Sequence, residues 1–127
     1  MCLMTVELNH ESSTLLSEAT QNQHRAIVSL KEELDAVDWY QQRADACTDD
    51  GLRAILLHNM NEEIEHAMMI LEWLRRNNSA FASNVERYLN SSGPITLVEQ
   101  AMTGKSGATS DSNVPSSLGV GSLKVSK

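Results

Sequence analysis

The first half of the chain carries an apolar stripe with a helical period. No proline or glycine occurs between residues 12 and 47, and small, apolar or amphipathic side chains recur there every three or four residues. This spacing places them along one face of an α-helix. The stripe comprises Ala19, Gln23, Ala26, Ile27, Leu30, Glu33, Leu34, Val37, Tyr40 and Ala44. We predict one amphipathic helix, capped at its start by Ser12 or Ser13 and ending near Cys47.

A second helical stripe follows a short break. The break, Thr48 to Gly51, contains turn-forming residues and aspartates that can cap the next helix. The second helix is predicted from about Leu52 to Arg76. Its stripe comprises Leu52, Leu56, Asn59, Met60, Glu63, His66, Ala67, Ile70, Trp73 and Leu74. Because the connection is short, the fold class predicted is all-α: an antiparallel two-helix hairpin, followed by short C-terminal helices.

Three ionisable side chains lie in these apolar stripes. Glu33 belongs to the first stripe, and Glu63 and His66 lie one turn apart in the second. Residues equidistant from the turn of an antiparallel hairpin are level, so Glu33 and Glu63 are both expected ~22 Å from position 48 at the rise of an α-helix. Buried carboxylates are costly unless they are paired or bind a cation. The sequence therefore predicts a buried metal site.

One chain supplies half of a di-iron ligand set. Ferritin-like di-iron bundles use two Glu-x-x-His pairs and one glutamate from each of two further helices. This chain has one such pair, Glu63 and His66, and one further glutamate, Glu33. Two hairpins that dimerise into a four-helix bundle would complete the set. Carboxylates with imidazole suit iron, and also manganese, better than thiolate-binding metals.

Three further side chains of the first helix have two interpretations each. Tyr40 lies two turns after Glu33 on the same stripe. It fits either a hydrogen bond to a metal ligand or bound oxygen species, or a core residue with its hydroxyl at the rim. Glu32 and Asp35 are either solvated charges or, in a dimer, an acidic mouth that draws Fe(II) toward the site.

The remaining chain divides into short segments. Residues 1–11 are expected to be flexible, and residues 12–103 form the helical domain, with short helices at 81–89 and 95–102 separated by Gly93-Pro94. Residues 104–115 are a Gly/Ser-rich linker, and apolar residues return in residues 116–127. An apolar cluster beyond such a linker has no fold of its own, so we interpret it as a peptide that docks on a partner; the alternative is a degenerate tail that is not under selection.

Charge and composition exclude several classes of function. Residues 1–103 hold 7 basic and 16 acidic residues, a net charge of −9, whereas residues 104–127 carry +2. With this net negative charge, residues 1–103 are expected to repel nucleic acid and to attract cations. The sequence contains neither an apolar run long enough for a membrane span nor a signal peptide pattern. Cys2 and Cys47 are interpreted as free thiols in a reducing cytosol.

Several blocks of the sequence, in order, resemble the encapsulated ferritins, the ferritin-like cargo of bacterial encapsulin nanocompartments. The resemblance covers about residues 17–103 and the C-terminal tail. The matching blocks are His24–Ser29, Glu32–Tyr40, Glu62–His66, Leu71–Arg76, Gly93–Thr96 and Ser117–Lys124. It implies a cytoplasmic ferroxidase that works inside the encapsulin shell, as a ring-shaped decamer built from dimers, in which each pair of chains shares one di-iron centre.

The resemblance also assigns roles to residues. The iron ligands are Glu33, Glu63 and His66 of both chains, with calcium or zinc as surrogate metals, and Tyr40 with its neighbour Trp39 supports the centre. Metal would reach the centre through Glu32 and Asp35, although Asp35 stands where the family has glutamate. Its carboxylate reaches one methylene less far, so metal is expected to bind less well there. The terminal Leu-Gly-x-Gly-Ser-Leu motif, within residues 116–127, is the signal for packaging in the shell.

Two other functions fit parts of the pattern. All-α nucleotide pyrophosphohydrolases bind Mg²⁺ through Glu-x-x-Glu/Asp pairs, which Glu32-x-x-Asp35 and Glu62-x-x-Glu65 match loosely. No lysine or arginine for the phosphates follows these carboxylates closely, and His66 favours iron over Mg²⁺. A non-catalytic helical interaction module is the other alternative, but it leaves the level carboxylates unexplained.

Overall fold

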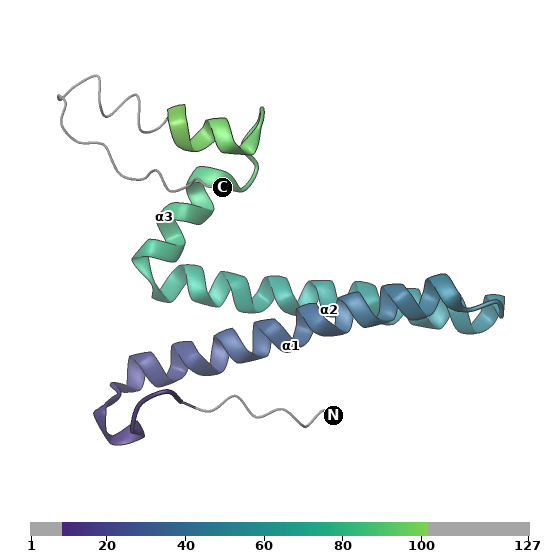
Figure 1. Cartoon of the computed structure of the whole chain (residues 1–127), viewed down its shortest axis with the longest axis horizontal. Helices are drawn as coiled ribbons and strands as arrows, with labels where there is room; N and C mark the ends of the chain where they lie inside the picture. Colours follow the sequence, from purple (N-terminus) through teal and green to yellow (C-terminus); the bar gives the residue numbers. More distant parts are fainter. Residues whose placement is uncertain (1–8, 102–127) are drawn as a thin grey trace. The chain divides into compact units, whose positions relative to one another are not determined.

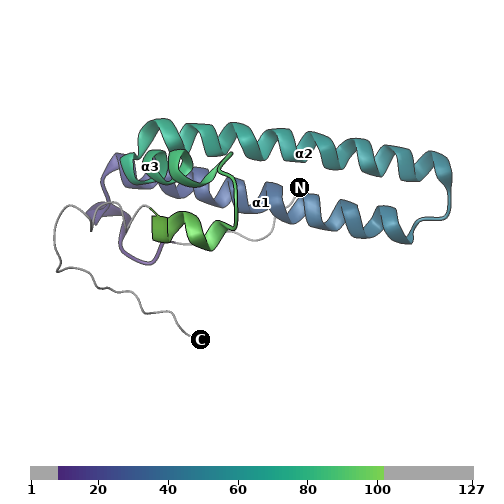
Figure 2. The same cartoon turned by 90° about the horizontal axis from the view of Figure 1, so that it is seen from above.

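The computed structural model describes residues 9–101, and those residues form an all-α structure. A 3₁₀ turn, η1 (Ser13–Leu15), precedes two long helices, α1 (Glu18–Ala46) and α2 (Asp50–Asn77). The two run antiparallel and side by side in both views (Figure 1, Figure 2). The predicted hairpin is therefore confirmed. The predicted boundaries at residues 1–8 and beyond 101, including the linker and the terminal peptide, lie outside the described residues.

The first long helix begins later than predicted. Ser12 caps the 3₁₀ turn instead, and the Ser17 hydroxyl oxygen accepts a hydrogen bond from the Thr20 amide, 3.1 Å away, to cap α1. The Gln21 side chain donates to the Leu16 carbonyl at 3.1 Å. Leu16 and Ser17, which connect the 3₁₀ turn to α1, both have an extended backbone. Two serine caps in succession divide the segment that the sequence pattern presented as one helix.

The connection between the helices is tight and well bonded. Cys47 ends α1, and the Asp49 carboxylate accepts from the Leu52 amide at 2.8 Å to cap α2, which therefore begins two residues before the predicted start. From the first turn of α2, the Arg53 guanidinium donates to the carbonyls of Ala44 and Cys47. These bonds satisfy carbonyls that the end of α1 leaves unpaired. The connection thereby fixes which residues of the two helices are level.

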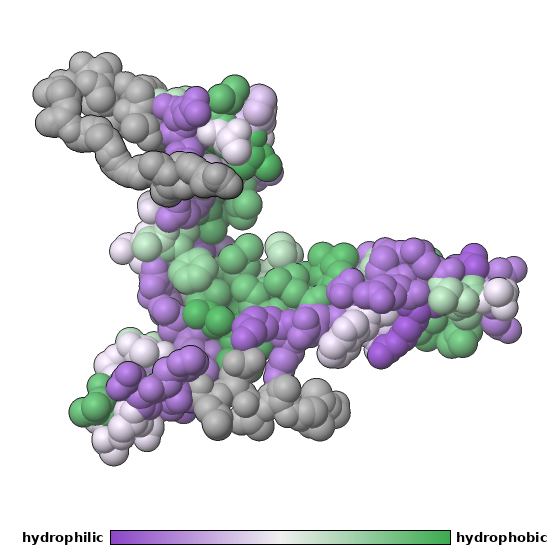
Figure 3. All heavy atoms as spheres, in the orientation of Figure 1, coloured by the Kyte–Doolittle hydropathy of each residue, from purple (hydrophilic) through white to green (hydrophobic). Residues whose placement is uncertain are grey.

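A single hairpin has a very small core. Among the described residues only Ala44, Ala67 and Leu74 are buried. Large apolar side chains remain substantially exposed along the hairpin; they include Leu34, Trp39, Ile55, Ile64, Met68, Met69 and Trp73. Figure 3 shows apolar surface along the middle of the two long helices. Contiguous exposed apolar surface of this kind marks an interaction site.

A short helix, α3 (Ser79–Tyr88), crosses the boundary between two compact units, one up to Ala82 and one from Ser83 onward. The Asn78 side chain caps α3 by accepting from the Phe81 amide at 3.0 Å. In the second unit, α3 gives way to a turn at Asn90, and Gly93 has a φ of 82°, which favours glycine, before a helix over residues 95–101. The predicted break is confirmed. No described helix is long and apolar enough to cross a membrane.

Candidate metal centre

The three predicted ligands come together on one side of the hairpin. Glu33 of α1 lies level with Glu63 and His66 of α2, and one ligand atom from each lies within 4.8 Å of the others. The His66 Nδ1 atom is 3.2 Å from Glu63 Oε1 and 3.7 Å from Glu33 Oε1. Among the described residues this is the one group of three or more such side chains close enough to share a cation. The level arrangement predicted from the turn is confirmed.

The prediction that this cluster is buried is wrong for a single chain. The side chains of Glu33 and Glu63 are 26% and 24% exposed, and that of His66 is 44% exposed. The reason is geometric, because two helices cover a side chain from one direction only. The Glu33–Glu63–His66 cluster therefore presents three ligands to a cation and leaves its other coordination positions open.

Without a metal ion, raised pKa values favour protons on Glu33 and His66 of the cluster. A hydrogen bond with Glu63, reinforced by partial burial, raises the pKa of Glu33 to about 7 from its ordinary 4.5. The same hydrogen bond lowers the pKa of Glu63, and the hydrogen bond to Glu63 raises the pKa of His66. When Glu33 and His66 are protonated, both can donate to the Glu63 carboxylate. A metal ion that binds here must displace these protons.

The metal-free protein is expected to lose stability as the pH rises from 4.5 through about 7, the range over which the pKa of Glu33 is raised. The folded cluster holds protons on Glu33, whose pKa is raised from 4.5 to about 7, and on His66, whose pKa is raised from 6.5. The stabilisation is complete below the unfolded pKa values and is lost as the pH passes through the folded ones. The lowered pKa of Glu63 acts in the opposite direction, but only below 4.5. Urea unfolding in the presence of a chelator measures the slope.

Two variants control this measurement. Glu33→Gln removes the carboxyl and should flatten much of the slope, whereas Glu65→Gln, at an exposed position of α2, should leave the slope unchanged. A free energy of unfolding that rises across the same pH range would contradict the raised pKa values of Glu33 and His66.

Comparison with known proteins decides the family. Residues 8–92 match the EncFtn-like family. The chain is 53% identical over 121 residues to the encapsulated ferritin-like protein of Rhodospirillum rubrum, across 91% of this chain and 86% of that relative. The chain belongs to the encapsulated ferritin-like family. The resemblance inferred from the sequence is thereby confirmed.

Two further relatives and one solved structure are also similar to this chain. The chain is 44% identical to the ferritin-like protein of Thermotoga maritima, covering 76% of this chain and 85% of the relative. It is 35% identical to the encapsulin nanocompartment cargo protein EncC of Myxococcus xanthus, covering 76% and 80%. The crystal structure of protein ne0167 from Nitrosomonas europaea, 50% identical, superposes with a TM-score of 0.67 over 70% of this chain and 98% of that one.

The other predicted site residues of this encapsulated ferritin-like chain lie outside the three-residue cluster. Glu32 and Asp35 are exposed on α1, and Tyr40 is partly buried. The Arg43 guanidinium lies over the Tyr40 ring, 5.4 Å from its centre, within the range of a cation–π contact. Sequence reasoning missed Arg43, although its spacing of three residues from Tyr40 was the available signal.

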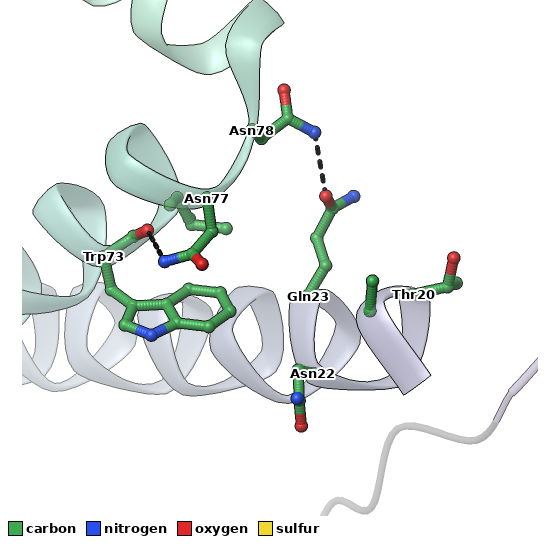
Figure 4. Close-up of a pocket in the computed structure, with 8 residues that line it drawn as sticks. Thr20, Asn22, Gln23, Trp73, Asn77 and Asn78 are labelled. Carbon is green, nitrogen blue, oxygen red and sulfur yellow. Dashed lines mark hydrogen bonds between the residues drawn. The ribbon is translucent and has the colours of Figure 1, made fainter. Parts of the chain in front are cut away.

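A cavity of about 350 Å³ lies away from the cluster, between the start of α1 and the end of α2. Carboxamides dominate its polar lining. Asn78 donates to the Gln23 side chain, and Asn77 donates to the Trp73 carbonyl, both at 2.9 Å (Figure 4). None of the described residues that line the cavity carries a carboxylate or an imidazole, so these residues do not supply the ligands that iron requires.

Proposed function

We propose that this protein is a ferroxidase, which oxidises Fe(II) to Fe(III) at a di-iron site shared by two chains. The observation that carries the proposal is the Glu33–Glu63–His66 cluster, whose ligand atoms converge within 4.8 Å. Two carboxylates and one imidazole hold about one iron ion, and two copies match the ligand set of a ferritin-like di-iron bundle. Membership of the encapsulated ferritin-like family supports the same reaction.

The partial exposure of the cluster is the argument for a second chain. A cation bound by one hairpin would have three protein ligands and face solvent on its open side. Exposed apolar side chains lie next to the ligands in sequence, among them Leu34 of α1 and Ile64 of α2. A second copy related by a two-fold axis would cover this surface and bring its own cluster to the first. The pair then contains four glutamates and two histidines.

Charge balance explains the chemistry of such a pair. Four carboxylates neutralise two Fe(II) ions, so uptake needs no further anion once the proton on Glu33 has left. Hard carboxylate oxygens favour the ferric product over the ferrous substrate. The side chains would thereby hold two Fe(II) ions, each of which gives up one electron, close together so that both can reduce the same oxidant molecule. Tyr40, held under Arg43, is proposed to support the centre from α1.

Glu32 and Asp35 are proposed as the access site for Fe(II). Both carboxylates are exposed on the same helix as Glu33, adjacent to it in sequence. Negative charge at this position raises the local concentration of a cation. The short side chain of Asp35 is expected to weaken, but not to abolish, this uptake.

We also propose that the protein is cargo of an encapsulin shell, where it forms a ring-shaped decamer in the cytoplasm of its cell. Its relative in Myxococcus xanthus is described as an encapsulin nanocompartment cargo protein. Residues 116–127 are the proposed docking peptide, and the shell stores the iron that the protein oxidises. No partner nucleic acid or membrane is proposed.

Deleting residues 116–127 is expected to prevent loading into the shell and to leave iron oxidation in solution unchanged. The reason is that the helical domain, not the tail, contains the Glu33–Glu63–His66 cluster. Co-expression with an encapsulin, followed by isolation of shells and quantification of cargo, measures loading. A deletion of equal length within residues 104–115 is the control and should still load. Shells filled with the truncated protein would refute the docking role.

The ferroxidase proposal is tested by mixing the apo protein with Fe(II) in air and following formation of Fe(III) by absorbance. Oxidation well above the buffer rate supports the proposal. Rates equal to the buffer rate overturn it, and hydrolysis of nucleoside triphosphates with Mg²⁺ would then favour the pyrophosphohydrolase.

A further inference from the structure

Two adjacent methionines of α2 differ in their position relative to the cluster. Met68 and Met69 are 50% and 57% exposed. Met69 follows His66 by three residues, so both side chains lie on one side of the helix with Cβ atoms ~5–6 Å apart. Met68 follows His66 by two residues and faces the opposite side. The pair thus has similar exposure but different proximity to the cluster.

We infer that Met69 is a modification site: hydrogen peroxide formed at the iron centre oxidises its thioether to the sulfoxide. The inference rests on the proposed ferroxidase activity and names a side reaction of the same site. Two Fe(II) ions, dioxygen and two protons give two Fe(III) ions and one hydrogen peroxide. The peroxide O–O bond then breaks, one oxygen bonds to the Met69 sulfur, which loses two electrons, and water leaves with the other oxygen.

The position of Met69 gives this reaction its selectivity. A thioether reacts with peroxide in proportion to its access to the oxidant. In the proposed two-chain assembly, a second copy would shield the His66 side of α2 from bulk solvent, and Met69 would lie one turn from where peroxide forms. Met60, one turn before Glu63, is partly buried and lies on the flank of Glu63 away from His66. Among the methionines in residues 9–101, Met69 is therefore the one that lies on the His66 side of the cluster, within reach of peroxide formed there.

The consequence is protection of the ligand. Peroxide that reacts at Met69 is consumed before it attacks the His66 ring or escapes into solution. Each Met69 reacts once, and reduction of the sulfoxide by a thiol-dependent reductase restores it. The residue acts as a renewable sacrificial reductant and has no part in binding iron.

The test compares sulfoxide at Met69 and Met68 by peptide mass spectrometry in the full-length protein, with cysteines alkylated first. One sample turns over Fe(II) in air with catalase present, which destroys escaped peroxide. The other receives bulk hydrogen peroxide without iron. We expect the ratio of Met69 to Met68 sulfoxide to be at least about fivefold higher after turnover, because oxidant formed at the centre reaches Met69 first. An equal or lower ratio overturns the inference.

Met69→Leu provides the second readout. This substitution keeps volume and apolar character, so iron oxidation should be unchanged while peroxide released per iron rises. Met68→Leu is the matched control and should release no more peroxide than the wild type. Unchanged release from Met69→Leu counts against scavenging. Iron oxidation is followed in the same samples. If the ferroxidase proposal fails, no Fe(III) forms above the buffer rate. If only this inference fails, Fe(III) forms but Met69 is not oxidised in preference to Met68.

Discussion

Replacing Glu63 or His66 with alanine is expected to abolish iron oxidation while the helices remain intact. Each substitution removes a ligand from both halves of a two-chain centre, because the same residue serves twice. Loss of even an outer-shell partner of a metal typically costs 10–100-fold in affinity or activity, so loss of a ligand should cost about 100-fold or more. The measurement is the initial rate of Fe(III) formation, with circular dichroism to verify helix content.

The matched control for these variants is Glu65→Ala. Glu65 has the same side chain as Glu63, lies on the same helix and is exposed outside the cluster. Its removal should leave the rate within about twofold of wild type, since exposed substitutions rarely perturb a site. Undiminished oxidation in Glu63→Ala or His66→Ala would remove the basis for the site.

Fe(II) is expected to drive association of the chains. In the proposed centre only the assembled state contains the complete ligand set, and a ligand stabilises the state that binds it. At a free metal concentration about 100 times the dissociation constant, each bound ion favours that state by about 2.7 kcal/mol, or about 100-fold in the association constant. Sedimentation velocity over a range of protein concentrations, with anaerobic Fe(II) or with chelator, measures the shift.

His66→Ala and His58→Ala separate this effect from nonspecific binding of metal. His58 is an exposed histidine of the same helix, 3.7 Å from Glu62 and outside the cluster. The His58 variant should associate with Fe(II) as the wild type does, whereas the His66 variant should not respond. Equal association with and without metal in the wild type would contradict a site shared between chains.

The sequence was sufficient to predict the relative height of the ligands. Glu33 and Glu63 are equidistant from a short turn, and helical rise is constant, so their level placement follows without knowledge of side-chain packing. The start of α1 was not predictable in the same way. Serines at 12, 13 and 17 all suit a cap, and only the contacts of Gln21 with the preceding carbonyls select Ser17.

The burial of the cluster could not be predicted from periodicity. A helical stripe marks side chains that avoid water, but it does not say whether the covering surface belongs to the same chain. In this hairpin Glu33 and Glu63 occupy the stripe and yet remain about one quarter exposed. The surface that would cover them is the one that a second copy is proposed to supply. Periodicity therefore does not distinguish burial within one chain from burial by the proposed second copy.

Native mass spectrometry after anaerobic addition of Fe(II) tests the central proposal most directly, because it reports bound iron and the number of chains in each species together. A centre shared by two chains predicts one iron per chain, found only in species with an even number of chains. Iron bound to single chains, or no bound iron in any species, would contradict the shared di-iron centre built from Glu33, Glu63 and His66.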